Sequence, residues 1–286
     1  MKKEIRQIDF IGMPINLGAR RHGVEQGTDL LRDIVFSRRL PGWHDCGDIE
    51  CKSFDSLSPE SGLTPFLDNI LDACTRLRDR MELSWSMGRF PFVAGGDHVL
   101  AWGSVAAFIR RYGMLSPKCL YIDAHGDFNS PAESPSHNMH GMHLAFATGM
   151  ETLAQAAELQ DGLTLSPKDI YFIGTRSLDA YEQRKAAELD MNFSRLYPQQ
   201  LTTEAPTHIS FDIDVLDPSV APGTGVPEPA GLSLDECIGV LRRAFEANNV
   251  VSFDFVEINP LLDSSEATRR AASAVVDLVD SYILRS

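Results

Sequence analysis

Metal-binding side chains follow an apolar run near the middle of the chain. Residues 119–122 are mainly apolar, and Asp123, His125 and Asp127 come directly after them at alternating positions. In an extended backbone, residues i, i+2 and i+4 point to one side, so one face would carry a carboxylate, an imidazole and a second carboxylate. Like charges on one face repel each other unless a cation or a proton lies between them. The spacing therefore indicates a metal site.

Two further stretches have the same organisation. Asp212 and Asp214 end the run Ser-Phe-Asp-Ile-Asp, and His98 ends the run Phe-Val-Ala-Gly-Gly-Asp-His. One such motif alone could equally be a solvated turn, or a helix start that Asp97 caps. Three motifs, each at the end of a strand-like run, favour a shared metal centre.

The candidate ligands are four carboxylates and two imidazoles: His98, Asp123, His125, Asp127, Asp212 and Asp214. This mixture of oxygen and nitrogen suits a pair of divalent ions such as Mn²⁺ better than zinc. Shared carboxylates could bridge two ions, and two ions acidify a bridging water enough to give hydroxide near neutral pH. The chemistry to expect is hydrolysis at a binuclear metal site.

Strand-like and helix-like segments alternate along the whole chain. We expect strands over 5–13, 44–51, 90–94, 119–123, 169–174, 192–196, 207–212 and 250–257. We expect helices over 27–39, 64–87, 100–112, 141–159 (as two pieces), 179–189, 234–247 and 264–284, with Thr64 and Ser233 as caps. This alternation predicts an α/β fold, a three-layer sandwich with a central, mainly parallel sheet of about eight strands and helices on both faces. No linker or repeat interrupts it, so residues 1–286 are predicted to form a single domain.

Composition narrows the class of protein. The chain has 286 residues, 43% of them hydrophobic, a formal net charge of −14 and a pI of about 4.9. An acidic surface disfavours binding to nucleic acid or to an anionic membrane and mildly favours cationic small molecules. Five cysteines without a CxxC pair indicate neither a disulfide framework nor a cysteine-zinc site. Without an apolar leader or a run long enough to span a bilayer, we expect a cytoplasmic protein.

The three motifs together resemble the ureohydrolase family, which includes arginases and agmatinases. The resemblance rests on Gly-Gly-Asp-His at 95–98, Asp-Ala-His-Gly-Asp at 123–127, Ser-Phe-Asp-Ile-Asp-Val-Leu-Asp-Pro at 210–218, and the segments 221–233 and 255–260. It covers nearly the whole chain. The loop 127–141 is more similar to bacterial-type arginases than to agmatinases, because Asn129, Ser136, Asn138 and His140 occupy the positions typical of arginases.

The resemblance implies a Mn-dependent hydrolysis of L-arginine to L-ornithine and urea, in which a metal-bridging hydroxide attacks the guanidinium carbon. One manganese would be held by His98, Asp123, Asp127 and Asp212, and the other by Asp123, His125, Asp212 and Asp214. Glu257 would pair with the guanidinium, Asp127 would pass a proton to the leaving amine, and His140 would act as a proton shuttle. Relatives of this kind commonly form trimers or hexamers.

The resemblance also implies an amino-acid clamp. Asn129 and Ser136, with Asn138 beside them, would bind the α-carboxylate, and Asp179, with Glu182 behind it, would bind the α-amino group. Taken singly, these residues have simpler interpretations. Asn129 and Ser136 are common turn residues, Asp179 could cap its helix, and His140 could be an ordinary loop histidine. Glu257 is harder to explain without a partner, because it ends an apolar strand.

Three features depart from the family pattern. His137 replaces a glycine, where its side chain could crowd the amino-acid end of the substrate, and Val226 replaces a threonine close to the guanidinium. The link 197–206 is too short for the helix usual between those strands. These differences keep open a ureohydrolase acting on another guanidine, such as agmatine or 4-guanidinobutyrate. A metal-binding homologue with weak turnover is the remaining alternative.

Overall fold

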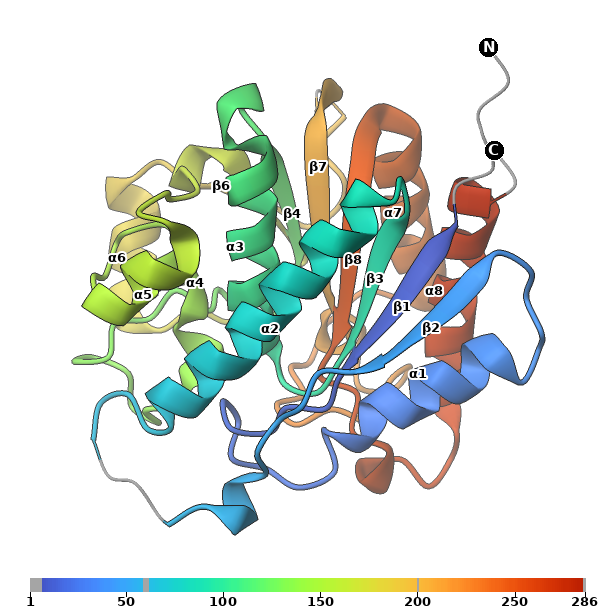
Figure 1. Ribbon diagram of the computed structural model, residues 1–286, viewed down its shortest axis with the longest axis horizontal. Helices are drawn as coiled ribbons and strands as arrows, with labels where there is room; N and C mark the ends of the chain where they lie inside the picture. Colours follow the sequence, from blue (N-terminus) through green and yellow to red (C-terminus); the bar gives the residue numbers. More distant parts are fainter. Residues whose placement is uncertain (1–6, 59–61, 200, 285–286) are drawn as a thin grey trace.

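A parallel sheet forms the centre of the molecule (Figure 1). The computed structural model describes residues 7–58, 62–199 and 201–284. Within them, eight strands pair in the order β2-β1-β3-β8-β7-β4-β5-β6, and every pairing is parallel. The strands are β1 (Ile8–Met13), β2 (Trp43–Asp48), β3 (Phe90–Gly95), β4 (Lys118–Ile122), β5 (Ile170–Ile173), β6 (Asn192–Ser194), β7 (Thr203–Asp212) and β8 (Asn248–Val256). The predicted α/β class and the parallel sheet are confirmed.

Helices cover both faces of the sheet and bury its apolar side chains in two separate layers. One layer packs beneath α1 (Gln26–Phe36), α7 (Leu234–Ala247) and α8 (Ala267–Leu284). The other packs beneath α2 (Leu67–Ser86), α3 (Ala101–Tyr112), α4 (His143–Ala147) and α5 (Ala154–Gln160), and α6 (Ala180–Glu188) contributes Ala186 to its edge. A sheet buried on both faces explains why the strands are almost continuously apolar.

Two predictions concerned connecting segments: the start of helix α2 and the short link from β6 to β7. Helix α2 begins at Leu67, not at Thr64, because Phe66 precedes it in the left-handed conformation with φ +60° and a buried ring. The short link from β6 to β7 contains no helix among its described residues, and residue 200 lies outside them. This link passes across β5 and β4, so it joins distant positions of the sheet.

The carboxyl ends of β3, β8, β7 and β4 lie side by side because these four strands are consecutive in the sheet. Each of them leads directly into one of the acidic or histidine-bearing motifs. In open parallel sheets, ligands bind at this edge. No helix within residues 7–58, 62–199 and 201–284 is long and apolar enough to cross a membrane.

Candidate metal centre and active site

The turn after β3 places His98 at the carboxyl end of the strand. Asp97 caps this turn, because its Oδ1 accepts a hydrogen bond from the backbone N of Val99 at 3.2 Å. Gly96 allows the turn to pass close to another loop: a Cβ there would lie 1.9 Å from the carbonyl oxygen of Ile15. The simpler interpretation of Asp97 as a cap is therefore correct, and it is the cap that presents His98.

His98 lies at the centre of the first group of candidate ligands. Its Nδ1 is 2.9 Å from Asp123 Oδ2, 3.1 Å from Asp127 Oδ2 and 3.2 Å from Asp212 Oδ2. Its other ring nitrogen, Nε2, lies 2.8 Å from Ser210 Oγ, which fixes the orientation of the ring. Three carboxylate oxygens and one imidazole nitrogen thus converge on one point from three different strands.

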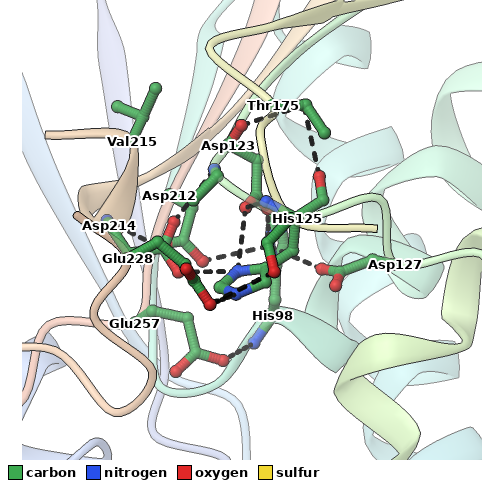
Figure 2. A network of polar contacts seen from close by, with 12 residues as sticks. His98, Asp123, His125, Asp127, Thr175, Asp212, Asp214, Val215, Glu228 and Glu257 are labelled. Carbon is green, nitrogen blue, oxygen red and sulfur yellow. Dashed lines mark hydrogen bonds and ion pairs between the residues drawn. The ribbon is translucent and has the colours of Figure 1, made fainter. Parts of the chain in front are cut away.

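The second group shares Asp123 with the first. His125 Nδ1 lies 3.0 Å from Asp214 Oδ2 and 3.5 Å from Asp123 Oδ1. The ligand atoms of Asp123, His125 and Asp214 lie within 4.8 Å of one another, as do those of His98, Asp123 and Asp212. Figure 2 shows these side chains gathered around His98. The structure therefore brings together all six predicted ligands as two adjoining groups.

The cluster concentrates four carboxylates around two imidazoles in a largely buried site. Burial and the neighbouring Asp214 and Asp123 raise the pKa of Asp212 well above its usual value. Burial alone would lower the pKa of His98, but the surrounding carboxylates raise it well above its usual value. Protons on these groups would offset the repulsion between carboxylates, and a divalent cation would do so more effectively by displacing them.

Two buried polar atoms support a metal-binding role. Asp123 Oδ2 and His125 Nε2 are buried, and neither atom forms a hydrogen bond. His98 Nδ1 lies 2.9 Å from Asp123 Oδ2, as an ion-pair partner. A buried polar atom without a partner is costly, and such atoms are rare in folded proteins. The donor set of oxygen and imidazole nitrogen, together with these orphaned atoms, fits a pair of divalent ions.

Glu257 and His140 form a pair beside the cluster. Glu257 Oε1 lies 2.9 Å from His140 Nδ1 and accepts a hydrogen bond from the backbone N of His98 at 2.9 Å. Burial lowers the pKa of His140, but Glu257 more than compensates and raises it to about 9. Both side chains line a cavity of about 320 Å³. Its other walls include Asp127, Asp212 and Asp214 from the cluster.

The rim of this cavity contains most of the predicted amino-acid clamp. Ser136, Asn138, Asp179 and Glu182 line the cavity, whereas Asn129 does not. Asn129 instead donates a hydrogen bond from Nδ2 to Asp179 Oδ2 at 2.5 Å. Glu182 is buried and accepts hydrogen bonds from the backbone N of Asp179 at 2.8 Å and of Phe128 at 3.1 Å. Burial raises the pKa of Glu182 to about 8.

The loop that carries Ser136 and Asn138 is held from outside by Arg20. The Arg20 guanidinium donates to Asn138 Oδ1 at 2.6 and 2.9 Å and to the carbonyl oxygen of Ser136 at 2.7 Å. Sequence reasoning gave Arg20 no role, because it is 116 residues away from Ser136 along the chain. Its contacts make it a positioning residue for the rim.

His137 and Val226, the two residues that depart from the family pattern near the cavity, have different consequences for its wall. His137 has φ +52°, a left-handed conformation that glycine adopts without strain. Its ring turns away from the cavity, with Nδ1 3.2 Å from the carbonyl oxygen of Pro131, so it does not line the cavity. Val226, in contrast, lines the cavity and exposes 41% of its surface. The departure that changes the cavity wall is therefore Val226.

Three residues of the site were missed by sequence reasoning. Glu228 lines the cavity, with Oε1 3.6 Å from His125 Nε2 and 3.1 Å from Ser177 Oγ. His143 and Tyr121 form a layer behind the cluster: Tyr121 donates to Asp127 Oδ2 at 2.7 Å, and its oxygen lies 3.2 Å from His143 Nε2. The signals available were the Pro-Glu-Pro of the loop at 227–229 and the spacing of His143 from His140.

Comparisons with known proteins agree with this geometry. Residues 6–279 match the model of the arginase family. A curated arginase of Staphylococcus aureus is 33% identical over 94% of this chain and 95% of its own length, and one of Bacillus subtilis is 32% identical over 97% and 98%. The solved structure of an arginase from Bacillus caldovelox superposes with a TM-score of 0.85 at 31% identity, covering 97% of this chain and 98% of its own.

The family match extends over the segments that supply every predicted metal ligand, so the site and the comparisons point to the same chemistry. The chain belongs to the arginase family and is a ureohydrolase, a hydrolase that acts on linear amidines.

Proposed function

We propose that this enzyme hydrolyses L-arginine to L-ornithine and urea with two Mn²⁺ ions. One observation carries the proposal: a single cavity is lined by carboxylates of the metal cluster together with Ser136, Asn138 and Asp179 of the rim. A guanidinium at the cluster and an amino-acid end at the rim are the two parts of arginine. The relatives called arginases at about a third identity support the same choice.

The metal ions would be held by the six clustered ligands. One ion would be held by His98, Asp123, Asp127 and Asp212, and the other by Asp123, His125, Asp212 and Asp214. Bound there, the ions would supply a nucleophile by lowering the pKa of a water. The oxygen-rich ligand set favours manganese over zinc.

The chain's own residues handle the cation and the protons. The guanidinium carbon is a poor electrophile, so its hydrolysis needs a proton for the leaving amine. Glu257 presents a carboxylate to the guanidinium, and its contact with His98 N holds it in place. Asp127, held by Tyr121, would pass the proton to the amine, and His140 would exchange it with solvent.

The rim would recognise the amino-acid end. Ser136 and Asn138, which line the cavity, would bind the α-carboxylate, and Asp179 would bind the α-amino group. Glu182 holds the Asp179 backbone directly, so its part is to position Asp179. Asn129 bonds to Asp179 and thereby helps to position it.

A second candidate substrate is another guanidine, such as agmatine or 4-guanidinobutyrate. The observation that favours it is the cavity wall: Val226 offers no hydroxyl, and Glu228 adds a carboxylate that the arginine hypothesis does not use. An additional carboxylate near His125 would suit agmatine, which has a net charge of +2, but not 4-guanidinobutyrate, which has no net charge. A metal-binding homologue with weak turnover is the least favoured reading, because all six ligands and Glu257 are present.

The test is urea release from the protein preloaded with Mn²⁺, comparing L-arginine, agmatine and 4-guanidinobutyrate. We expect arginine to be hydrolysed well ahead of the other two. Faster hydrolysis of agmatine or 4-guanidinobutyrate would overturn the arginine assignment and leave the metal chemistry intact. Absence of hydrolysis with two ions bound would overturn the proposed activity.

Further parts of the proposal concern the whole molecule. We propose that the 286 residues form one domain, because the sheet takes strands from β1 through β8. We propose a cytoplasmic setting, which suits the five free thiols. We also propose a trimer or hexamer, which analytical ultracentrifugation would distinguish from a monomer.

A further inference from the structure

A second group of metal-binding atoms lies away from the active site, where β2 forms the edge of the sheet. It consists of Asp9 on β1 and of His44 and Cys46 on β2, and this set is named the edge triad. Asp9 and His44 are direct partners in the parallel pairing, and Cys46 follows His44 by two residues, so all three side chains point to one face. Asp9 and His44 lie near the amino ends of their strands, whereas the active site lies at the carboxyl ends.

The geometry of the edge triad matches that of a tetrahedral metal ion. His44 Nδ1 lies 3.3 Å from Cys46 Sγ and 3.4 Å from Asp9 Oδ1, and the three ligand atoms lie within 4.8 Å of one another. Around a tetrahedral zinc ion with ordinary bond lengths, nitrogen and oxygen ligands lie about 3.3 Å apart, and nitrogen and sulfur ligands about 3.6 Å apart. Small adjustments of the exposed His44 ring would suffice to bind such an ion.

The buried member of the triad is already fixed in orientation. Asp9 is fully buried, and its Oδ2 accepts a hydrogen bond from Ser84 Oγ at 2.7 Å. Its Oδ1 accepts another from Arg89 Nη1 at 3.2 Å, which leaves a lone pair of Oδ1 directed toward His44. Hydrogen bonds of this kind orient carboxylate ligands in known metal sites. His44, with 55% of its side chain exposed, leaves a route for the ion and for a water as fourth ligand.

We propose that Asp9, His44 and Cys46 bind a thiophilic divalent cation of the Zn²⁺ class, separately from the catalytic ions. Binding forms bonds to Oδ1, Nδ1 and Sγ and releases the thiol proton to solvent, while the neutral imidazole carries its proton on Nε2. With a thiolate and a carboxylate, the ion's two charges are balanced, and Arg89 stays paired with Asp9. The proposal does not depend on which guanidine the enzyme hydrolyses.

The ligand types select against the catalytic metal. An ordinary cysteine is protonated near neutral pH, so the metal-free triad holds a thiol. Only an ion that bonds strongly to sulfur displaces that proton readily near neutral pH. Mn²⁺ prefers oxygen ligands, so the six-ligand cluster and the edge triad would take different metals from the same solution.

The experiment is a titration of the full-length, Mn²⁺-loaded protein with Co²⁺, a spectroscopic substitute for Zn²⁺. A thiolate-to-cobalt charge-transfer band in the near ultraviolet reports on a cysteine-containing site and not on the catalytic site, because the proposed catalytic ligands include no cysteine. We expect the band to saturate at one equivalent and to disappear when Zn²⁺ is added. Absence of the band in the unaltered protein would overturn the proposal.

Variants assign the band to the triad. Cys46→Ser should abolish it and His44→Gln should weaken Co²⁺ binding at least tenfold, while both keep the urea release of the Mn²⁺-loaded enzyme. Cys51→Ser, which alters the other half-buried cysteine, is the matched control and should keep the band. Ser84→Ala should weaken binding about tenfold by freeing Asp9. A band that persists in Cys46→Ser, or that is lost in Cys51→Ser, would refute the assignment.

Discussion

The metal cluster and the rim of the cavity are built in different ways. The cluster ligands follow the three strands β3, β4 and β7, are mostly buried, and include pairs within hydrogen-bond distance of one another. The rim residues Ser136 and Asn138 lie on a loop outside the sheet, are exposed or half-exposed, and are held by Arg20. The sheet thus fixes the candidate metal ligands, whereas loop contacts hold the rim that we propose to bind the amino-acid end of the substrate.

Asp123→Asn is expected to cause the largest loss of activity and of bound metal. Asp123 contributes to both ligand groups, and the substitution removes a charge while keeping the volume. We expect kcat/KM to fall by about 10³-fold or more, and bound metal to fall from two ions to one or none. Urea assays and elemental analysis measure both.

The control for this change is Asp190→Asn, an exposed position outside the cavity. It should retain the full metal content and activity. If Asp123→Asn also kept two ions and full activity, the shared-ligand arrangement would be wrong.

Glu257→Gln tests the link between the cluster and His140. Removing the carboxylate withdraws the charge that raises the pKa of His140, so that pKa should fall from about 9 toward the ordinary value of about 6.5. Because the folded-state pKa is raised, the pair stabilises the metal-free protein below the unfolded value, and this contribution disappears as pH rises through about 9. NMR titration of His140 and unfolding at pH 6 and pH 10 measure the change.

Activity should decrease about 10²-fold in the same variant, since the guanidinium would lose the carboxylate partner that we propose for it. An unchanged pKa of His140 would show that Glu257 does not control this histidine. Stability that falls equally at pH 6 and pH 10 would point to a packing defect.

The metal cluster and the loops around the cavity also differ in how far the sequence could predict them. Spacing at i and i+2 indicated Asp123 with His125 and Asp212 with Asp214, but the extended backbone assumed for these pairs is wrong. Strand β4 ends at Ile122, and Asp214 lies in a short 3-10 helix, Ile213–Val215, so the turns after the strands bring these side chains together. The capping signal of Ser233 predicted helix α7 to the residue. The start of α2 was wrong because buried Phe66, not Thr64, sets it.

Contacts between distant loops could not be predicted. The strand order β3-β8-β7-β4 arises from crossovers that no local pattern encodes, so the approach of His98 to Asp212 was expected only from the three motifs and the family resemblance taken together. Glu228 is 103 positions from His125 and lies in a loop rich in proline and glycine, so only the folded chain shows their approach. Arg20 and Ser136, 116 residues apart along the chain, likewise come into contact only in the folded chain.

At the rim, Asp179→Asn should change substrate choice more than chemistry. The substitution keeps an oxygen for Asn129 but removes the charge proposed to bind the α-amino group. We expect KM for arginine to rise tenfold or more, with kcat little changed. KM for 4-guanidinobutyrate, which has no α-amino group, should stay the same. Equal changes for both substrates would exclude an amino-group contact.

Arg20→Gln tests whether the loop needs its external support. The change removes contacts to Ser136 and Asn138 at a half-exposed site, where such bonds contribute modestly. We expect KM for arginine to rise about threefold. Arg39→Gln is the matched control, because Arg39 has a similar left-handed φ of +50° and does not line the cavity. An equal effect of both changes would deny Arg20 a specific role.

Val226→Thr should give the smallest effect and the sharpest test of the cavity wall. A hydroxyl there could accept or donate one hydrogen bond at the guanidinium end, and at this partly exposed position such a bond contributes about 0.5 kcal/mol, or about twofold in kcat/KM. Val226→Ala removes bulk without adding a hydroxyl and serves as the comparison. A gain for arginine in the threonine variant alone would mean that the wall limits this reaction. A loss in that variant alone, with agmatine hydrolysed preferentially by the unaltered enzyme, would mean that the wall is adapted to another guanidine.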